Sequence, residues 1–338
     1  MSILVTGGAG YIGSHTCVEL LNNGRDVIVL DNLVNSSKIA LQRVEQITGK
    51  KLKFYQGDCC LAKDVYRVFK ENKIEAVIHF AGLKSPLESI YKPLEYYDNN
   101  LTGTFVLLKI MQEFNCYKFI FSSSATVYGE PEEVPIKENA KKGEITNPYG
   151  KTKAILEDVL QDIYQADKRW QIVLLRYFNP IGAHESGLIG ENPKGIPANL
   201  LPYITQVAVH KLAKLSVFGN DYPTPDGTCL RDYIHVVDLA KGHVKALHVL
   251  DHSENSVHIY NLGTGKACSV LEVIHTFEQV NQVQIPYEIK ERRKGDVASS
   301  YADPHKAYVE MHWQAQKNLA DMCRDSWRWQ KNNPNGYE

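Results

Sequence analysis

The sequence lacks several features that mark other classes of protein. Its 38 Lys and Arg nearly balance its 39 Asp and Glu, so the formal net charge is −1, and the two signs are interleaved along the chain. Such a pattern excludes the basic surface of a nucleic-acid-binding or membrane-surface protein. No apolar run approaches the roughly 20 residues that cross a bilayer. We therefore expect no nucleic-acid partner and no membrane partner.

Cysteine usage and the first residues bear on the compartment. The seven cysteines lack C-x-x-C spacing, and Cys59 and Cys60 are adjacent, which is typical of a reduced, cytoplasmic protein. The N-terminus has no basic segment and no uninterrupted apolar stretch, so we expect no secretory signal. Two pairs of metal-binding residue types stand about one helical turn apart, but neither has further ligands nearby, so we expect no metal. These pairs are His248 with His252 and Glu272 with His275.

Among the residues that are present, Tyr149 and Lys153 are the most informative. They follow a serine run that ends at Ser124, and at i and i+4 on a helix they would share one face. A free tyrosine titrates near pH 10, and lowering its pKa by roughly 3 units requires about 4 kcal/mol. A cation about 4 Å away supplies roughly that energy at an effective dielectric near 20. The spacing predicts a tyrosinate general base, although an isolated pair would more often be a surface tyrosine stacked on a lysine.

The beginning of the chain favours the catalytic interpretation. An apolar run at residues 2–5 leads into a glycine turn with Gly7, Gly10 and Gly13, and a helix and a second strand ending at Asp31 follow. Strand, glycine turn, helix, strand and acid is the order of a dinucleotide site. The glycines let the backbone approach a pyrophosphate at the helix N-terminus. Asp31 would accept hydrogen bonds from the adenosine ribose and repel a 2′-phosphate, which favours NAD over NADP.

Strand-like and helix-like segments alternate through the first half, which predicts an α/β fold with a doubly wound, Rossmann-type parallel sheet. Small or polar residues end these strands, at the edge where such sheets bind ligands. Beyond Asn179 this rhythm breaks. We expect an NAD-binding domain at 1–179 and a second, smaller α/β substrate-binding lobe at 180–338, with some segments returning to the first domain. Predicted strands cover 2–5, 26–31, 53–58, 76–82, 118–124 and 172–176, and predicted helices include 14–23 and 149–166.

Taken together, the glycine turn, Asp31, Ser124, Tyr149 and Lys153 resemble an extended short-chain dehydrogenase/reductase. Longer strings over the whole chain are similar to the UDP-glucose/UDP-galactose 4-epimerase family. These strings are HFAGLK at 79–84, PLEYYDNN at 93–100, LRYFNP at 175–180, RDYIHV at 231–236 and RRKGD at 292–296.

The resemblance implies site residues of three kinds. The implied catalytic residues are Ser124, Tyr149 and Lys153. The implied NAD-binding residues are Gly7, Gly10, Tyr11, Ile12, Gly13, Asp31, Asn32, Asn35, Ser36, Asp58, Cys59, Phe80, Ala81, Gly82, Lys84, Asn99, Ser122, Tyr149, Lys153, Tyr177 and Phe178. The implied UDP-sugar-binding residues are Lys84, Ser124, Tyr149, Asn179, Asn199, Leu200, Ser216, Val217, Phe218, Arg231, Tyr233, Arg293, Asp296 and Ser300.

Two of these assignments leave alternatives open. Arg231 and Arg293 can neutralise a diphosphate. Arg292 stands beside Arg293, however, and either guanidinium could do this work. Taken alone, Arg231 could instead form a surface ion pair with the neighbouring Asp232.

The resemblance also implies a mechanism and a specificity. Tyr149, helped by Ser124, removes the C4 hydroxyl proton while NAD takes the C4 hydride and later returns it to the other face of a 4-keto sugar. Ser300 stands where a tyrosine restricts members of the family to plain hexoses. A serine implies room for an acetamido group, so UDP-GlcNAc and UDP-GalNAc would be substrates alongside UDP-Glc and UDP-Gal. The alternative is a strict UDP-Glc/UDP-Gal epimerase in which a neighbouring side chain refills this space.

Two further functions share the fold. Nucleotide-sugar 4,6-dehydratases carry an Asp-Glu pair after the serine or threonine, but Ala125 and Thr126 follow Ser124 here and cannot do that acid–base work. A non-catalytic NAD sensor could dispense with Tyr149 and Lys153. The resemblance finally implies a homodimer formed through helices near 101–114 and 154–164.

Overall fold

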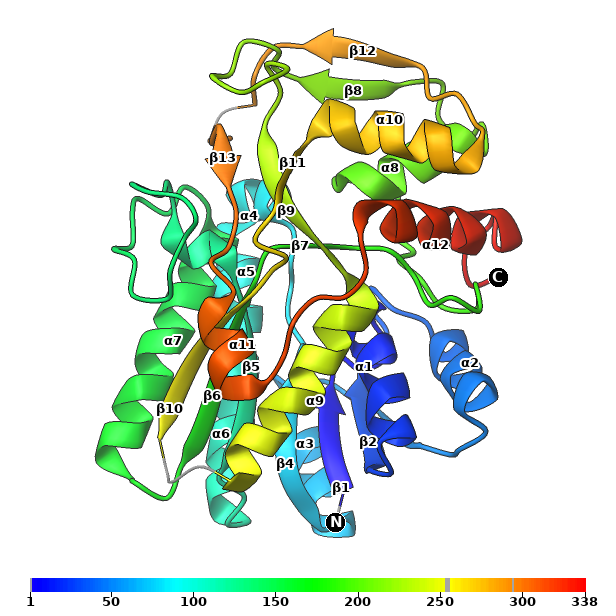
Figure 1. Cartoon of the computed structure of the whole chain (residues 1–338). Coiled ribbons are helices and arrows are strands. Elements are labelled where there is room, and N and C mark those ends of the chain that lie inside the picture. Colours follow the sequence, from blue (N-terminus) through cyan, green and yellow to red (C-terminus); the bar gives the residue numbers. More distant parts are fainter. Residues whose placement is uncertain (1, 253–255, 294) are drawn as a thin grey trace.

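The computed structural model describes residues 2–252, 256–293 and 295–338 (Figure 1), so Lys294 of the RRKGD string lies outside it. Its centre is a seven-stranded sheet in the order β10-β6-β5-β4-β1-β2-β3, and all six strand pairs are parallel. The predicted doubly wound α/β fold is therefore confirmed. The strands are β1 (Ser2–Thr6), β2 (Asp26–Asp31), β3 (Lys53–Gln56), β4 (Ile74–His79), β5 (Lys118–Ser124), β6 (Gln171–Tyr177) and β10 (Val257–Leu262).

Helices cover both faces of this sheet, which is why its strands read as nearly continuous apolar runs. Alternate side chains of β1 enter different cores: Ile3 and Val5 pack on one face and Leu4 on the other. The first face is covered by α1 (Tyr11–Asn22), α2 (Lys38–Thr48), α9 (Val236–His252) and α11 (His305–Met311). The second is covered by α3 (Ala62–Glu71), α6 (Gly103–Glu113) and α7 (Pro148–Ala166).

Three elements that follow residue 180 belong to this sheet domain, namely α9, β10 and α11. Strand β10 pairs with β6, with Val257 opposite Ile172, and α9 packs against α1. After β6 the chain leaves the sheet domain through β7 (Asn179–Ile181), and it first returns with α9 and β10. The exit lies close to the expected domain boundary at residue 179. The division into 1–179 and 180–338 stays a prediction, and the segments that return are α9, β10 and α11.

A second lobe lies over the carboxyl ends of the parallel strands (Figure 1). Its apolar core joins helices α8, α10 and α12 to strand β8. A smaller sheet, in which β9 pairs with β7, β11 and β13, connects this lobe to the sheet domain. The elements are α8 (Leu200–Ala208), β8 (Leu215–Phe218), β9 (Leu230–His235), β11 (Ala267–Ser269), α10 (Val270–Asn281), β12 (Tyr287–Lys290), β13 (Ser299–Ser300) and α12 (Leu319–Asn332).

Element boundaries differ from the sequence prediction at the glycine turn. Helix α1 begins at Tyr11 instead of residue 14, because Gly10 is its N-cap and its carbonyl accepts the Ser14 amide at 2.9 Å. The turn is therefore one tight loop between β1 and α1. The remaining short elements are α4 (Pro86–Tyr91), α5 (Pro93–Tyr97), a π-helical turn (Asp98–Thr102) and a 3₁₀ turn (Ala125–Tyr128). Within the described ranges, no helix is both long and apolar enough to cross a membrane.

Candidate active site

The glycine turn leaves no room for side chains. Gly7 has φ +69°, and a Cβ placed on it would lie 2.8 Å from the Ala81 amide nitrogen at the end of β4. A Cβ on Gly13 would lie 2.3 Å from the Gly7 carbonyl oxygen, although its backbone is helical. The turn and the N-terminus of α1 thus form a bare backbone cradle, which fits the pyrophosphate of a dinucleotide.

Asp31 ends β2 beside this cradle and is almost completely buried. One carboxylate oxygen accepts the Ala9 amide at 3.0 Å. The other accepts the Leu33 amide at 2.9 Å and the Ser36 hydroxyl at 2.7 Å. Asp31 therefore connects the glycine turn to the loop that carries Asn35. A ribose diol would share or replace the bond from Ser36.

The end of β3 contributes a second predicted group. Asn32 donates to the Asp58 carboxylate at 3.0 Å, and the other oxygen of Asp58 accepts the Cys60 amide at 2.8 Å. The Cys59 side chain instead packs in the core with α3 and α6, where burial raises the pKa of its thiol. Cys59 can therefore contact a bound cofactor only through its backbone.

The opposite wall of the cradle follows β4. Lys84 lies 5.9 Å above the ring of Tyr11, whose hydroxyl donates to the Gly182 carbonyl at 2.6 Å. The Lys84 ammonium also lies 3.3 Å from a carboxylate oxygen of Glu191, and Asn199 donates to the same oxygen at 3.0 Å. Glu191 thus connects a predicted cofactor residue to a predicted substrate residue. Glu191 belongs to no sequence motif and lies in an irregular segment, so no sequence pattern predicts its role.

Other predicted residues of this wall are placed as follows. Gly82 is exposed at φ +155°, and Ile12, Phe80, Ala81 and Asn99 are partly buried. Asn99 lies in the π-helical turn and approaches the Cys60 sulfur at 3.8 Å. Phe178 is buried beside the 3₁₀ turn.

Tyr149, Lys153 and Ser124 come together where α7 begins above the end of β5. Asn147 caps α7 by accepting the Gly150 amide at 2.8 Å, so Tyr149 and Lys153 lie in its first two turns, and both are buried. The Ser124 hydroxyl accepts the Thr126 amide at 3.2 Å and lies near enough to the Tyr149 phenol to favour its ionised form.

Lys153 reaches across to β5, where its ammonium donates to the Ser122 carbonyl at 2.7 Å. It lies 4.7 Å from the ring centroid of Phe121 and 6.0 Å from that of Tyr149. The Ser122 hydroxyl in turn is hydrogen-bonded to the hydroxyl of Tyr177 on β6. The cation is therefore held at the strand end and not directly on the phenol.

Burial controls the ionisation of this pair. It raises the pKa of Tyr149 to about 12, an effect that the nearby Ser124 hydroxyl opposes. It lowers the pKa of Lys153 to about 8, an effect that the negative charge of Glu157 opposes. The prediction that one lysine suffices to bring Tyr149 near neutral pH is therefore wrong for the chain by itself. A lysine about 4 Å away can offset the ordinary pKa of tyrosine, but not the additional free energy of burying a tyrosinate.

In the second lobe, β8 divides three predicted residues between two faces. Ser216 and Phe218 lie on the partly exposed face, whereas Val217 is buried among the apolar side chains of the lobe. Val217 can therefore contact a ligand only through its backbone, as the period of two along a strand requires. The guanidinium of Arg293 lies 3.8 Å from the ring centroid of Phe218.

The structure distinguishes the two adjacent arginines. Arg292 donates to the Asp221 carboxylate at 2.7 Å and lies 4.0 Å from the ring centroid of Tyr222. Arg293 lies on the aromatic platform of Phe218 instead. The geometry therefore favours Arg293 as the ligand-binding guanidinium.

Strand β9 places Arg231 and Tyr233 on one face. Arg231 donates to the carbonyl of Val297 at 2.8 Å and lies 3.8 Å from the Asp296 carboxylate. Ser300 on β13 pairs with Arg231 and is half-buried. The segment 296–300 thus lies directly beside the β9 arginine.

Asp232 points to the other face of β9, so the simple ion pair with Arg231 is not formed. Its carboxylate accepts the backbone amides of Thr264 at 2.8 Å, Gly265 at 3.0 Å and Ala302 at 3.1 Å. Asp232 therefore holds β13 and its Ser300 against β9. Of the remaining predicted residues, Asn179 begins β7, Asn199 caps α8, and Leu200 begins that helix.

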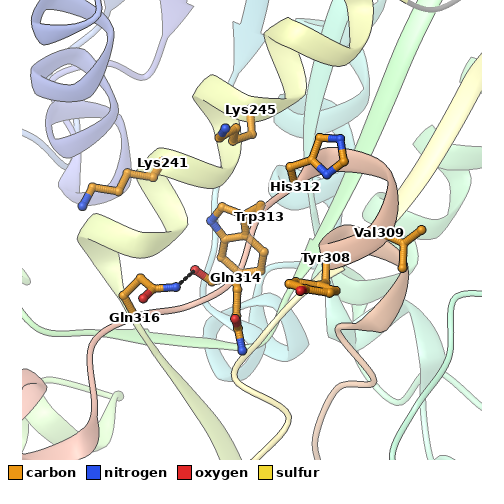
Figure 2. A pocket seen from close by; sticks show the side chains of 8 residues that line it. All are labelled: Lys241, Lys245, Tyr308, Val309, His312, Trp313, Gln314 and Gln316. Carbon is orange, nitrogen blue, oxygen red and sulfur yellow. Dashed lines mark hydrogen bonds between the residues drawn. The ribbon is translucent and has the colours of Figure 1, made fainter.

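A cavity on the outer side of the sheet domain contains none of the predicted residues (Figure 2). It lies between α9, which carries Lys241 and Lys245, and the segment from Tyr308 to Gln316. No group of three or more His, Cys, Asp or Glu side chains that could hold a metal ion occurs in the part of the chain that the structure describes.

Comparison with known proteins agrees with the geometry. Residues 4–326 match a protein family described as GDP-mannose 4,6 dehydratase. The UDP-glucose 4-epimerase of Bacillus subtilis is 60% identical over 338 residues, covering 100% of this chain and 99% of the relative. The chain belongs to the UDP-glucose 4-epimerase family.

Solved structures of the family superpose closely. The UDP-glucose 4-epimerase of Bifidobacterium longum, crystallised with NAD⁺ and UDP, has a TM-score of 0.96 and 58% identity, covering 99% of this chain and all of the other. The UDP-Glc/GlcNAc 4-epimerase of Campylobacter jejuni has a TM-score of 0.85 and 37% identity, covering 98% and 99% of the two chains.

Proposed function

We propose that this protein is an NAD-dependent epimerase that interconverts UDP-glucose and UDP-galactose at C4. The observation that carries the proposal is the meeting of Ser124, Tyr149 and Lys153 beside the glycine cradle, at the edge of the sheet that faces the second lobe. This edge is where doubly wound sheets bind ligands. The names of the most similar relatives support UDP-glucose as the substrate.

The chain's own groups divide the work. When bound, NAD supplies a hydride acceptor and, in its oxidised form, a positively charged ring. Tyr149, which lies near Ser124, takes the proton from the C4 hydroxyl and returns it. Lys153 holds a positive charge near the phenol and, through the Ser122 carbonyl, fixes the helix to β5. The hydride leaves and returns within one catalytic cycle, so no added cofactor is consumed.

Arg293 and Phe218 are proposed to bind the uridine diphosphate end of the substrate. Replacing Arg293 by Ala should raise the KM for UDP-galactose about 10–100-fold with a smaller change in kcat, since a charge-assisted contact is worth roughly 1.5–3 kcal/mol. Steady-state kinetics measures this change. Arg292→Ala is the matched control, because Arg292 is already paired with Asp221. A larger KM effect in the control would reassign the diphosphate contact.

A second activity, on UDP-GlcNAc and UDP-GalNAc, is favoured by one specific feature. Ser300 and its neighbour Ser299 are small side chains on β13 beside Arg231. A serine leaves more volume at this place than the tyrosine of the strict enzymes, and an acetamido group needs such volume. The similarity to an enzyme named for both glucose and N-acetylglucosamine substrates is consistent with it.

An NMR assay of purified protein with UDP-galactose and UDP-GalNAc, without added NAD, tests both activities. We expect conversion of UDP-galactose, and conversion of UDP-GalNAc that Ser300→Tyr lowers at least tenfold while sparing UDP-galactose. Conversion of UDP-galactose alone would support the proposed UDP-glucose/UDP-galactose activity and refute the proposal that Ser300 makes room for an N-acetyl group. Failure to convert either sugar would contradict the proposed function.

The homodimer predicted through α6 and α7 also stays a proposal. Ile155 on α7 is 38% exposed, and Phe105 and Val106 on α6 are partly exposed, so both helices present apolar side chains outward.

A further inference from the structure

A buried ion pair lies directly behind the Tyr149 and Lys153 side chains. Glu157 follows Lys153 by one helical turn on α7 and is fully buried. One of its carboxylate oxygens accepts the Ser123 hydroxyl at 2.6 Å and the Arg176 Nε at 2.9 Å. The other accepts the Arg176 Nη2 at 2.6 Å. The pair thus ties α7, β5 and β6 together.

Arg176 extends this connection to the turn that follows Ser124. Its Nη1 donates to the hydroxyl of Tyr128 at 3.1 Å and to the Glu138 carbonyl at 2.9 Å. Tyr128 is the last residue of the 3₁₀ turn, and its hydroxyl donates to Asn261 on β10 at 2.6 Å. A change at Arg176 would therefore reach the 3₁₀ turn that the Ser124 hydroxyl caps by accepting the Thr126 amide.

Ser123 lies between the two β5 residues that the reaction uses. The carbonyl of Ser122 accepts a hydrogen bond from the Lys153 ammonium, and the hydroxyl of Ser124 lies near the Tyr149 phenol. Side chains alternate along a strand, so Ser123 points away from Ser124 and toward α7. The Ser123 hydroxyl donates to Glu157 at 2.6 Å, and this bond therefore fixes the position of the end of β5 relative to α7, the helix that carries Tyr149 and Lys153.

Glu157 also provides the negative charge that favours the Lys153 ammonium. Burial lowers the pKa of His79 on β4 to about 3 and raises that of Tyr177 on β6, so both face Lys153 as neutral groups near pH 7. Burial likewise keeps Tyr149 neutral in the free chain, and Arg176 is positive. Lys142 also approaches Glu157, at 3.7 Å, from the side of the 129–147 loop.

Stability alone does not account for this arrangement. Replacing a buried ion pair by well-packed apolar side chains is often neutral or stabilising, because burying two charges is costly. We propose that the Glu157–Arg176 pair is a positioning pair for catalysis, which fixes the strand end that carries Ser124 and sets the Glu157 carboxylate one helical turn behind Lys153. The proposal rests on the proposed epimerase function, and Glu157 acts through its neighbours without touching the substrate.

The variant Glu157→Gln separates this role from a structural one. The neutral amide removes the negative charge and leaves Arg176 positive, so the pKa of Lys153 should fall from about 8 by about 1 unit. Because the reaction needs the ammonium, the alkaline limb of the pH–kcat profile should move to lower pH by the same amount. We expect kcat near pH 8 to fall about fivefold with little change in KM, since a pKa that moves from about 8 to about 7 leaves roughly a tenth of Lys153 protonated at that pH instead of half.

Three companion variants sharpen the test. The double variant Glu157→Gln with Arg176→Met removes both charges, so it leaves no unpaired buried arginine should the single variant be unstable. The alkaline limb of its pH–kcat profile should again move to lower pH. Ser123→Ala should lower kcat without moving the limb. The control Asp251→Asn breaks the pairs with Arg25 and Lys118 at the other end of β5, and should lower the melting temperature alone.

The outcomes are decisive in either direction. The proposal would be overturned if both Glu157 variants kept the wild-type kcat and an unmoved alkaline limb of the pH–kcat profile. It would also be overturned if Asp251→Asn moved that limb by the same amount. If wild-type protein converts no UDP-sugar, the proposed function fails, but NMR titration of ¹³C-labelled lysine still measures the pKa of Lys153, with Lys153→Arg assigning the signal. A lower pKa in Glu157→Gln supports the positioning pair, and an unchanged one refutes it.

Discussion

Replacing Tyr149 by Phe is expected to lower kcat for UDP-galactose by about 10²–10⁴-fold, the range that a positioned general acid–base group contributes. Phenylalanine keeps the ring and loses only the hydroxyl that lies near Ser124. The glycine cradle and Asp31 remain, so the purified variant should still carry NAD. Stopped-flow or NMR kinetics measures the rate, and absorbance of the acid-released nucleotide measures the cofactor.

Tyr117→Phe is the matched control. Tyr117 lies near the amino end of β5, where its ring packs edge-on against Trp170 and its hydroxyl makes only a long 3.4 Å bond to Asn115. Its loss should leave kcat within about a factor of two, as surface changes usually do. A Tyr149→Phe enzyme with near-normal turnover would refute the assignment of the base.

Replacing Gly13 by Ala is expected to remove bound NAD and to lower the free energy of unfolding by about 3 kcal/mol, the upper part of the range for overpacking. The added Cβ would lie 2.3 Å from the Gly7 carbonyl oxygen and 2.7 Å from the Gly8 Cα, and both are backbone atoms of the turn. To relieve this contact the turn must open, which displaces the amides at the N-terminus of α1. Denaturant unfolding and cofactor content of the purified variant test the two effects.

Gly24→Ala, just beyond the other end of α1, is the control. A Cβ there meets no atom within 4 Å, so only the strain at φ +75° remains, roughly 1 kcal/mol. The control should retain NAD. Retention of NAD by Gly13→Ala as well would show that the turn can relax, contrary to the expected close packing.

The order of small and apolar residues along the chain was enough to predict the fold and the general position of the site. The glycine turn and Asp31 lie on a strand–helix–strand unit that has only one common arrangement, and local sterics dictate it. The Tyr149 and Lys153 spacing likewise specified a shared helix face. Resemblance to a family then named residues such as Phe218 and Ser300, whose neighbours lie far away in the sequence.

Only the tertiary structure decided which groups meet and how they ionise. The choice between Arg292 and Arg293 depended on Asp221 and Phe218, some 70 residues earlier. The link from Lys84 through Glu191 to Asn199 joins segments that no local pattern relates. The sequence by itself determined where the chemistry-bearing residues stand along helices and strands, because periodicity is local. Burial, which raises the pKa of Tyr149 and lowers that of Lys153, is a property of the whole packed chain, and so it required the fold.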